Sequence, residues 1–500
     1  MRHISPAAGS PIRVPVPVML ALEAPAIGQS AQECRRDVER ARPWSRTGRD
    51  VITLRRALPR GLIAIGSAAD EAGPEGNSKE MATVKKRVGV IGAGIVGIAA
   101  ASYLQRDGHE VFVVDPDPPG AGASFGNAGC FNPSSIVPMS MPGTLRKVPQ
   151  WLADPLGPLA IRWSYLPWLA PWLVRFIRAG TPALVEAEAR ALSGLLGPCF
   201  AALVPLLKDA GAEDLIRRLG HLVVYRSAAG VAKDAAAWEL RRQNGIGWEE
   251  LGADELRQFD PQLSREYVRG ILLTANGHTT DPQALVATLA DAFARQGGKL
   301  HRARALDLVL EGARLRAIRT DAGDLPAEAA VVAAGAYSKP LAAVLGDRIP
   351  LESERGYHLM IRDPEVSPRV PTNDADGKFV ATPMANGLRF AGTVELAGLA
   401  AAPDWRRARM LLEQGRRLFP GLATRYPEER ISLWMGHRPS LPDSLPVIGP
   451  SRRSPDVFYA FGHGHVGMTG GPMTGKLIAE LVSGRPPAID LGPFRASRFA

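Results

Sequence analysis

Three glycines and one aspartate have the residue types and the spacing of a dinucleotide-binding site. The apolar segment Arg87–Ile91 leads into Gly92-x-Gly94-x-x-Gly97, and a second apolar segment ends at Asp115. In such a unit the first glycine permits a tight turn, the second lets the backbone approach a pyrophosphate, and the third lets a helix pack closely on the sheet. Phosphates bind at the helix N-terminus, where free N–H groups and the helix dipole favour anions. Asp115 is placed to accept a hydrogen bond from a ribose hydroxyl. A structural glycine-rich turn is the alternative.

The elements that must position these residues follow the order strand, turn, helix, strand. After Asp115 the chain continues with Ala123–Gly129, where small and hydroxyl residues let a nucleotide lie against the backbone, unless this segment is a surface turn. Besides the motif residues, we expect a nucleotide to contact Ala93, Ile95, Val96, Ser124, Asn127, Ala128 and Gly129 and, later in the chain, Gly335.

Composition and charge limit the class of protein. The chain of 500 residues is long enough for two domains, and its 46% hydrophobic and 22% charged residues are ordinary for a globular protein. Cys34, Cys130 and Cys199 lie far apart without a C-x-x-C pair, which indicates a reducing compartment and no metal site. The net charge of +10 comes from scattered Arg and Lys residues, so we expect no nucleic-acid partner. Because no run of eighteen apolar residues occurs, we expect no membrane-spanning segment.

Residues 1–80 differ from the rest of the chain. They are rich in Pro, Ala, Arg and Gly and lack periodicity, which predicts disorder. Arg55-Arg56 before a short apolar run resembles a twin-arginine export signal, but the run lies far from the N-terminus. Met81 leads directly into the first strand, and we interpret residues 1–80 as a dispensable extension.

A chain that begins at Met81 is therefore expected to fold, to bind its nucleotide and to keep its activity. Solubility, bound nucleotide and activity of the shortened and the full chain are the measurements. Loss of any of these on removal of residues 1–80 would contradict the interpretation.

Three separated segments have the character of a nucleotide domain. The first surrounds Val88–Asp115. The second passes through the helical pattern Ala284–Gln296 into an all-apolar strand that ends at Gly335, as a buried parallel strand does before a crossover. The third is the apolar run Val457–Phe461, followed by a glycine-rich turn and a helix. We expect an α/β fold with a discontinuous, Rossmann-like nucleotide-binding domain over 85–135, 270–340 and 432–495, and an inserted α+β substrate domain over 136–269 and 341–431.

Three further motifs follow in the second half of the chain. They are Glu354-Arg355-Gly356-Tyr357-His358, Trp434-x-Gly436-x-Arg438-Pro439 and Phe461-Gly462-His463-Gly464-His465. Together with the glycine motif, and in this order, they make the chain resemble the FAD-dependent amine and amino-acid oxidoreductases of the D-amino-acid oxidase superfamily, above all the bacterial D-amino acid dehydrogenases. The resemblance covers about residues 87–495.

The resemblance implies roles for individual residues. Arg438 matches the arginine that clamps the substrate carboxylate, a role that suits a planar and always charged fork, although a surface arginine is the alternative. Tyr357 would donate to that carboxylate or form a pocket wall, unless it is a core residue. His465, like His463, would contact flavin or substrate, unless both are structural histidines. The backbone of Gly464, Gly467, Met468 and Thr469 would face the flavin.

The resemblance also implies an activity. FAD is the expected cofactor and no metal is expected. A D-amino acid would lose a hydride from Cα to flavin N5, and the imino acid would hydrolyse to a 2-oxo acid and ammonia, with electrons passing to a non-oxygen acceptor such as a quinone. A D-proline or hydroxy-D-proline dehydrogenase and a glycine- or sarcosine-type oxidase are alternatives. A nucleotide-binding protein without turnover is an alternative of another class, for which Arg438 would have no evident purpose.

One aromatic segment bears on location. Trp163–Ile177 holds three of the nine tryptophans, and Arg162, Arg175 and Arg178 lie in or beside it. Aromatic residues with basic neighbours are typical of a membrane interface, and an amphipathic helix packed on the substrate domain is the alternative. We expect a cytoplasmic protein, with peripheral contact to the inner face of the cell membrane through this segment as a hypothesis.

Overall fold

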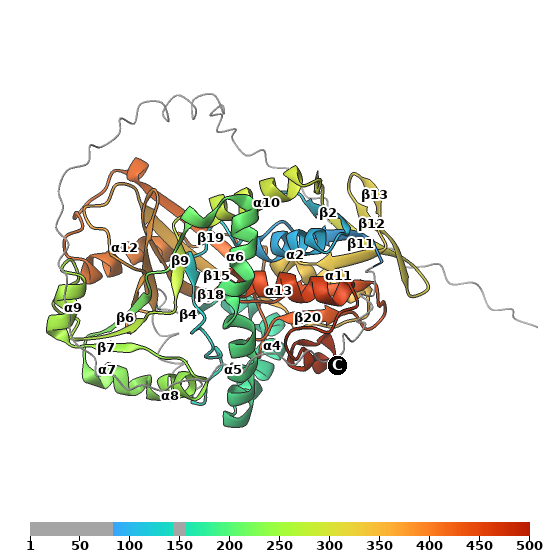
Figure 1. Ribbon diagram of the computed structural model, residues 1–500. Coiled ribbons are helices and arrows are strands. Elements are labelled where there is room, and N and C mark those ends of the chain that lie inside the picture. The colour runs from blue at the N-terminus through green and yellow to red at the C-terminus, as the bar shows by residue number, and fades with distance from the viewer. Residues whose placement is uncertain (1–83, 144–156, 158) are drawn as a thin grey trace, which may run out of the picture. The chain divides into compact units, whose positions relative to one another are not determined.

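The computed structural model describes residues 84–143, 157 and 159–500 (Figure 1). The predictions for residues 1–80 lie outside the described residues. Within the described part, two large sheets dominate, one of six strands and one of nine.

The six-stranded sheet has the order β10-β2-β1-β14-β21-β20. All neighbouring pairs are parallel except β20 with β21, which are antiparallel. Parallel strands need crossover connections that cover both faces of the sheet, which explains the apolar runs in these strands. The strands are β1 (Arg87–Ile91), β2 (Glu110–Asp115), β10 (Lys299–Arg302), β14 (Ala329–Val332), β20 (Val447–Pro450) and β21 (Val457–Phe461).

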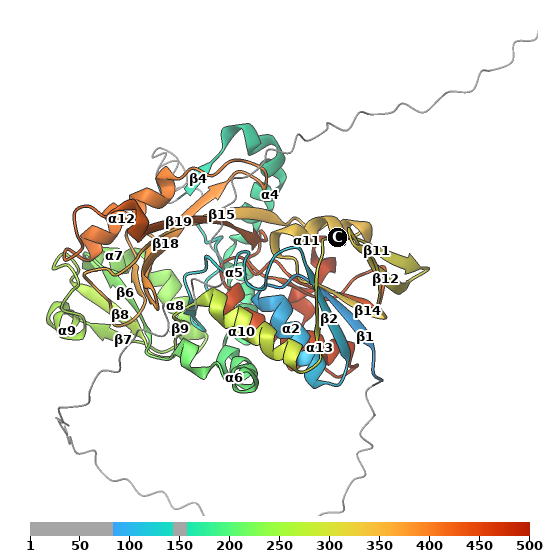
Figure 2. The same ribbon diagram turned by 90° about the horizontal axis from the view of Figure 1, so that it is seen from above.

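Alternate residues of these strands face two different cores. In β2, Val111 and Val113 join one core, whereas Phe112 and Val114 join the other. The first core packs against α2 (Ile95–Arg106), α10 (Pro282–Arg295) and α13 (Gly467–Val482), which lie side by side (Figure 2). The second packs against α11 (Ser338–Val344) and the small sheet of β11 (Ala305–Glu311), β12 (Arg314–Thr320) and β13 (Gly323–Pro326).

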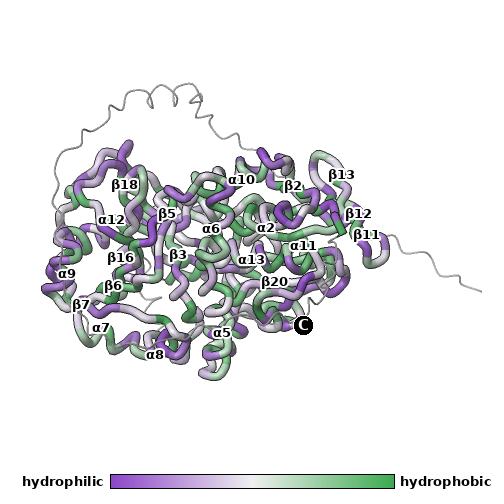
Figure 3. Tube along the Cα trace, viewed as in Figure 1, coloured by the Kyte–Doolittle hydropathy of each residue, from purple (hydrophilic) through white to green (hydrophobic). Residues whose placement is uncertain are grey.

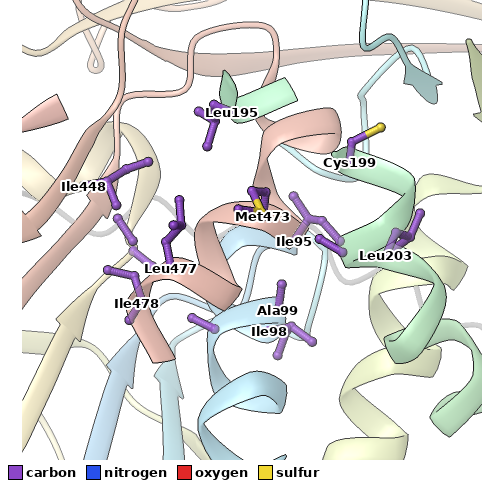
Figure 4. Packing of buried hydrophobic residues seen from close by; sticks show 14 of the residues in the cluster. Ile95, Ile98, Ala99, Leu195, Cys199, Leu203, Ile448, Met473, Leu477 and Ile478 are labelled. Atoms are coloured by element: carbon purple, nitrogen blue, oxygen red, sulfur yellow. The ribbon is translucent and has the colours of Figure 1, made fainter. Parts of the chain in front are cut away.

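Small residues let α2 and α13 approach closely. A Cβ atom on Gly475 would lie 2.6 Å from the backbone carbonyl carbon of Ala99, so only glycine fits there. Figure 4 shows Ile98 and Ala99 of α2 beside Met473 and Leu477 of α13. This packing fixes the N-terminal ends of both helices relative to the sheet.

The nine-stranded sheet has the order β19-β15-β18-β17-β16-β6-β8-β7, and β4 pairs with β18. Helix α12 (Arg406–Leu418) packs against β15, β18 and β19. The helices α8 (Ala235–Gln243) and α9 (Ala253–Phe259) contain many hydrophilic residues (Figure 3). The strands are β4 (Leu159–Ile161), β6 (His221–Tyr225), β7 (Glu249–Leu251), β8 (Arg269–Leu273), β15 (Glu352–Ile361), β16 (Thr372–Asp374), β17 (Phe379–Met384), β18 (Gly387–Leu396) and β19 (Ile431–Ser440).

A fourth sheet, of three strands, and four further α-helices complete the sheets and α-helices of the described residues. The sheet joins β3 (Cys130–Phe131), β9 (Gly277–Thr279) and β5 (Ile216–Arg217). The helices are α4 (Leu166–Ala179), α5 (Pro182–Leu196), α6 (Cys199–Ala210) and α7 (Ala228–Lys233).

The mixed α/β class predicted from the sequence is confirmed. Each of the three segments predicted for the nucleotide domain supplies two strands of the six-stranded sheet. However, β8 and β19 belong to the nine-stranded sheet, so the boundaries predicted near residues 270 and 432 fall in strands of that sheet. The domain limits themselves stay a prediction.

Among the described residues, one helical stretch, Pro182–Ala210, is long and apolar enough to cross a membrane, judged by length and composition alone. The sequence contains no unbroken run of eighteen apolar residues, so this stretch was not expected. Half of its apolar window is buried inside the protein. Leu195, Leu203 and Leu206 of this stretch lie in the same core as α2 and α13. The apolar composition is therefore accounted for by packing.

Candidate active site

A cavity of about 910 Å³ lies where the carboxyl ends of the parallel strands meet the nine-stranded sheet. Ligands of open α/β sheets bind at this edge. Most of the predicted site residues line it; only Gly97 and Gly129 of that set do not. The lining residues of that set are Gly92, Ala93, Gly94, Ile95, Val96, Asp115, Ser124, Asn127, Ala128, Gly335, Tyr357, Arg438, Gly464, His465, Gly467, Met468 and Thr469.

The three motif glycines are required for three different reasons. Gly92 has φ of 113°, a conformation that other residues rarely adopt. A Cβ on Gly97 would lie 1.9 Å from the carbonyl oxygen of Gly92, so this glycine lets α2 pack on the turn. A Cβ on Gly94 would come within 4 Å of one protein atom only, the Ser124 hydroxyl at 3.5 Å. Because Gly94 lines the cavity, a side chain at this position would extend into the cavity and would not clash with other protein atoms.

Asp115 and Ser124 hold the turn in place. The Asp115 carboxylate accepts hydrogen bonds from the backbone N–H of Ala93 at 2.7 Å and of Asp117 at 2.9 Å. Burial raises the pKa of Asp115, whereas these two hydrogen bonds lower it. The Ser124 hydroxyl accepts from the N–H of Ile95 at the start of α2. Asp115 therefore fixes the backbone that faces the ligand and still borders the cavity.

The start of α13 is a second helix N-terminus that borders the cavity. Its first residues, Gly467, Met468 and Thr469, line the cavity, and no side chain caps the helix. The Thr469 hydroxyl accepts from the N–H of Asn132, which ties this end to the segment after β3. Uncapped N–H groups at a helix N-terminus favour negative charge.

Arg438 lies on the cavity face of β19. Its guanidinium donates to the carbonyl oxygen of Thr393 at 3.0 Å and lies across Gly356, where a Cβ would be 2.3 Å from Nη2. Thr393 has φ of 59° at an irregularity in the pairing of β15 with β18, which turns its carbonyl toward Arg438. Burial lowers the pKa of Arg438, and Glu354, directly opposite on β15, raises it. Arg438 therefore presents a positioned positive charge to the cavity.

Tyr357 does not offer a free hydroxyl to a ligand. The hydroxyl donates to Glu395 at 2.5 Å and accepts from the backbone N–H of Asp404 at 3.0 Å. Burial and the bond to Glu395 raise the pKa of Tyr357 to about 12. The ring packs edge-on against Trp405 at the start of α12. The donor role predicted for Tyr357 is not seen in this arrangement, because neighbouring groups already satisfy its hydroxyl.

The two histidines of the glycine-rich turn differ. His463 is buried, and its Nε2 shares a hydrogen bond with the Thr474 hydroxyl at 2.9 Å, which matches the structural alternative. The side chain of His465 is exposed to the cavity. Loss of hydration among the surrounding protein atoms, and then the positive charge of Arg438, lower the pKa of His465 to about 4. His465 is therefore neutral at ordinary pH.

The sequence interpretation missed one prominent lining residue. Trp434 of β19 lines the cavity, and His358 stacks on its indole with ring centroids 5.3 Å apart. Its ring lies against the backbone of Gly126 and Gly436. Both glycines are present in motifs of the sequence, but no local pattern indicated that Gly126 and Gly436 pack against the same side chain.

Comparisons with known proteins bear on the family and the fold of this chain. The model of the family described as FAD dependent oxidoreductase matches residues 87–481. A D-amino-acid oxidase of Bradyrhizobium diazoefficiens is 47% identical over 417 residues, which cover 83% of this chain and 99% of the relative. A D-amino acid dehydrogenase of Rhizorhabdus wittichii is 32% identical, covering 83% and 100%. The crystal structure of glycine oxidase from Geobacillus kaustophilus, 22% identical, has a TM-score of 0.61, covers 83% of this chain and 99% of its own, and shows the shared fold.

Proposed function

Because this chain belongs to the family of FAD-dependent oxidoreductases, we propose that it oxidises a D-amino acid to the 2-imino acid, which water converts to the 2-oxo acid and ammonia. The observation that carries the proposal is one cavity that is lined both by the glycine turn before α2 and by Arg438. The names of relatives at 47% and 32% identity support the D-amino acid as substrate.

The residues present fit FAD. The open space beside Gly94 would hold the pyrophosphate at the start of α2, and Asp115 would accept a hydrogen bond from a ribose hydroxyl. The uncapped start of α13 would face the part of the ring system that gains negative charge on reduction. When bound, FAD supplies the acceptor for the hydride that leaves the substrate Cα.

An Asp115→Ala variant is expected to bind FAD about 1–3 kcal/mol more weakly, because it removes a buried acceptor and releases the N–H groups of Ala93 and Asp117. The measurement is titration of the apoprotein with FAD. An unchanged dissociation constant would remove Asp115 from the cofactor site.

The side chains around the substrate act by positioning. Arg438 would bind the carboxylate with two parallel N–H donors and so fix Cα relative to the cofactor site. His465, neutral because its pKa is about 4, adds no second positive charge to the cavity. Between pH 6 and pH 9 it does not titrate, so the pH dependence of the rate in this range would follow the substrate amine, which must be neutral to release a hydride.

The electron acceptor is part of the proposal. We infer a non-oxygen acceptor such as a quinone in the membrane, and the exposed side chains of α4 and of the short turn Trp163–Tyr165 before it support contact with the membrane. Trp163 is 67% and Trp168 71% exposed, and Arg175 and Arg178 are exposed on the same segment. Residues 162–181 include no acidic residue, so this face suits an anionic lipid surface. The proposed location is cytoplasmic, on the inner face of the membrane.

The membrane contact predicts that the purified protein sediments with vesicles that contain anionic lipid and that Trp163→Ser with Trp168→Ser reduces this binding at least about tenfold, since both indoles would leave the interface. Activity with a soluble dye should not change. Equal sedimentation of variant and wild type would exclude this face as the contact.

The function is tested by a panel of D- and L-amino acids, D-proline, glycine and sarcosine with an artificial acceptor, a quinone or oxygen. The proposal expects bleaching of the flavin absorbance by D-amino acids and faster turnover with quinone than with oxygen. Bleaching by glycine or D-proline alone would assign the alternative substrates. The 47% identical relative is named an oxidase, so oxygen as the faster acceptor is the second outcome, and it would overturn the quinone proposal.

A further inference from the structure

Trp434 occupies a fixed place in the cavity. A Cβ on Gly126 would lie 2.0 Å from Cε3 of the indole, and a Cβ on Gly436 would lie 1.9 Å from Cη2. The ring is therefore in contact with the backbone of two separate segments, the loop after β2 and its own strand. His358, which is buried and donates from Nδ1 to the carbonyl oxygen of Gly126, stacks on the ring at an angle of 22°. These three neighbours pack against the indole and hold it in its place.

The indole lies beside Arg438. Gly356 of β15 and Gly436 of β19 are direct partners in the antiparallel pair. The Cβ positions of such partners are about 5 Å apart. Because the guanidinium lies across the first glycine and the indole across the second, the two side chains are neighbours on one floor of the cavity. Each of the two glycines is needed to make room for one of them.

The other residues on this face of the sheet are smaller. Trp434 pairs with His358, which pairs with Ala391, and Ala391 pairs with Val380. Ala391 and Val380 line the cavity along with Trp434. Of the described residues that line the cavity, Trp434 is the one tryptophan. A carboxylate held by Arg438 thus has a large rigid wall on one side and small side chains on the other.

We propose that Trp434 is the specificity-determining residue of the substrate site, a wall that limits the side chain of a D-amino acid bound to Arg438 and favours short, unbranched side chains over aromatic ones. This inference rests on the proposed function. A rigid wall discriminates by size, since a side chain that exceeds the space must displace packed atoms.

The experiment compares D-alanine with D-phenylalanine in wild type, Trp434→Ala and Trp434→Phe. The ratio of kcat/KM for D-phenylalanine to that for D-alanine is expected to rise at least about tenfold in Trp434→Ala, in line with the discrimination that one or two methylenes provide, and less in Trp434→Phe. Flavin content should stay near that of wild type. Trp248→Ala is the matched control, because Trp248 packs on Trp238 outside the cavity and should leave the ratio unchanged.

A binding measurement separates this inference from the proposed function. Propionate and 3-phenylpropionate carry the carboxylate but no amine, and their dissociation constants can be read from the shift in flavin absorbance. Trp434→Ala should bind 3-phenylpropionate at least about tenfold more tightly relative to propionate. If wild type oxidises no D-amino acid but Trp434→Ala shows this change in relative affinity, the proposed function fails and the role of Trp434 as a wall is supported. If D-amino acids are oxidised and neither ratio changes in a variant that keeps its flavin, the wall is overturned.

Discussion

A Gly94→Val variant is expected to fold and to purify without flavin. The space into which the new side chain would extend contains only the Ser124 hydroxyl within 4 Å of the Cβ position, so the protein itself tolerates the change. The same space borders the cavity at the start of α2, where the pyrophosphate of FAD would lie. A valine there should reduce FAD binding by at least about 3 kcal/mol, which is more than a hundredfold.

The neighbouring glycines supply the controls. Gly97→Ala places a methyl group 1.9 Å from the carbonyl oxygen of Gly92, and Gly92→Ala forces φ of 113° on a residue with a side chain. Both should lower the thermal unfolding midpoint of the apoprotein, whereas Gly94→Val should not. Absorbance near the flavin bands and melting curves of the apoproteins are the measurements. Full flavin content in Gly94→Val would show that the cofactor does not approach this turn.

Arg438→Ala is expected to lower kcat/KM for the D-amino acid by about a hundredfold to a thousandfold, or roughly 3–4 kcal/mol. The variant loses both donors for the carboxylate and leaves the carbonyl oxygen of Thr393 without its guanidinium partner. The rate at saturating substrate should fall along with the apparent affinity, because a misplaced Cα raises the barrier itself. Arg438→Lys keeps a charge but not the planar fork, so its loss should be smaller than that of alanine but still large.

Flavin content and substrate esters distinguish this role from a structural one. In the proposed function Arg438 binds the substrate and not the cofactor, so both variants should retain FAD. D-amino acids esterified at the carboxyl group should be poor substrates of wild type and nearly indifferent to the mutation. Equal sensitivity of acid and ester, or loss of flavin from Arg438→Ala, would mean that this arginine holds the sheet together and that the substrate class is open.

Local sequence patterns were sufficient for the nucleotide-binding part of the protein. The spacing of Gly92, Gly94 and Gly97 predicted a turn into a helix, and that helix begins at Ile95. The apolar runs that end at Asp115 and Phe461 are strands of the same six-stranded sheet. The helical pattern at 284–296 corresponds to α10. These features are local, because backbone conformation and periodicity depend on residues a few positions apart.

The sequence alone also placed Arg438 among the candidates, and the structure puts it in the cavity, yet its surroundings could not be read from the chain. The Thr393 carbonyl that orients it is 45 residues away, and the Gly356 that makes room for it is on another strand. The partners of Tyr357 are equally distant: Glu395 lies 38 residues later and Asp404 lies 47 residues later, and together they satisfy the hydroxyl that the sequence had left free.

By itself, the sequence determined the fold class and the glycine turn before α2, because glycine spacing and apolar periodicity express their physical roles locally, and the resemblance of its motif made Arg438 a candidate. Only the tertiary structure decided which polar side chains are already satisfied and which large side chain stands beside Arg438. Strand register brings Gly356 opposite Gly436, and the loop after β2 brings Gly126 against Trp434. Such contacts depend on the pairing of segments that are distant in the sequence. The entropy that loop closure costs and the free energy that packing gains are properties of the whole fold.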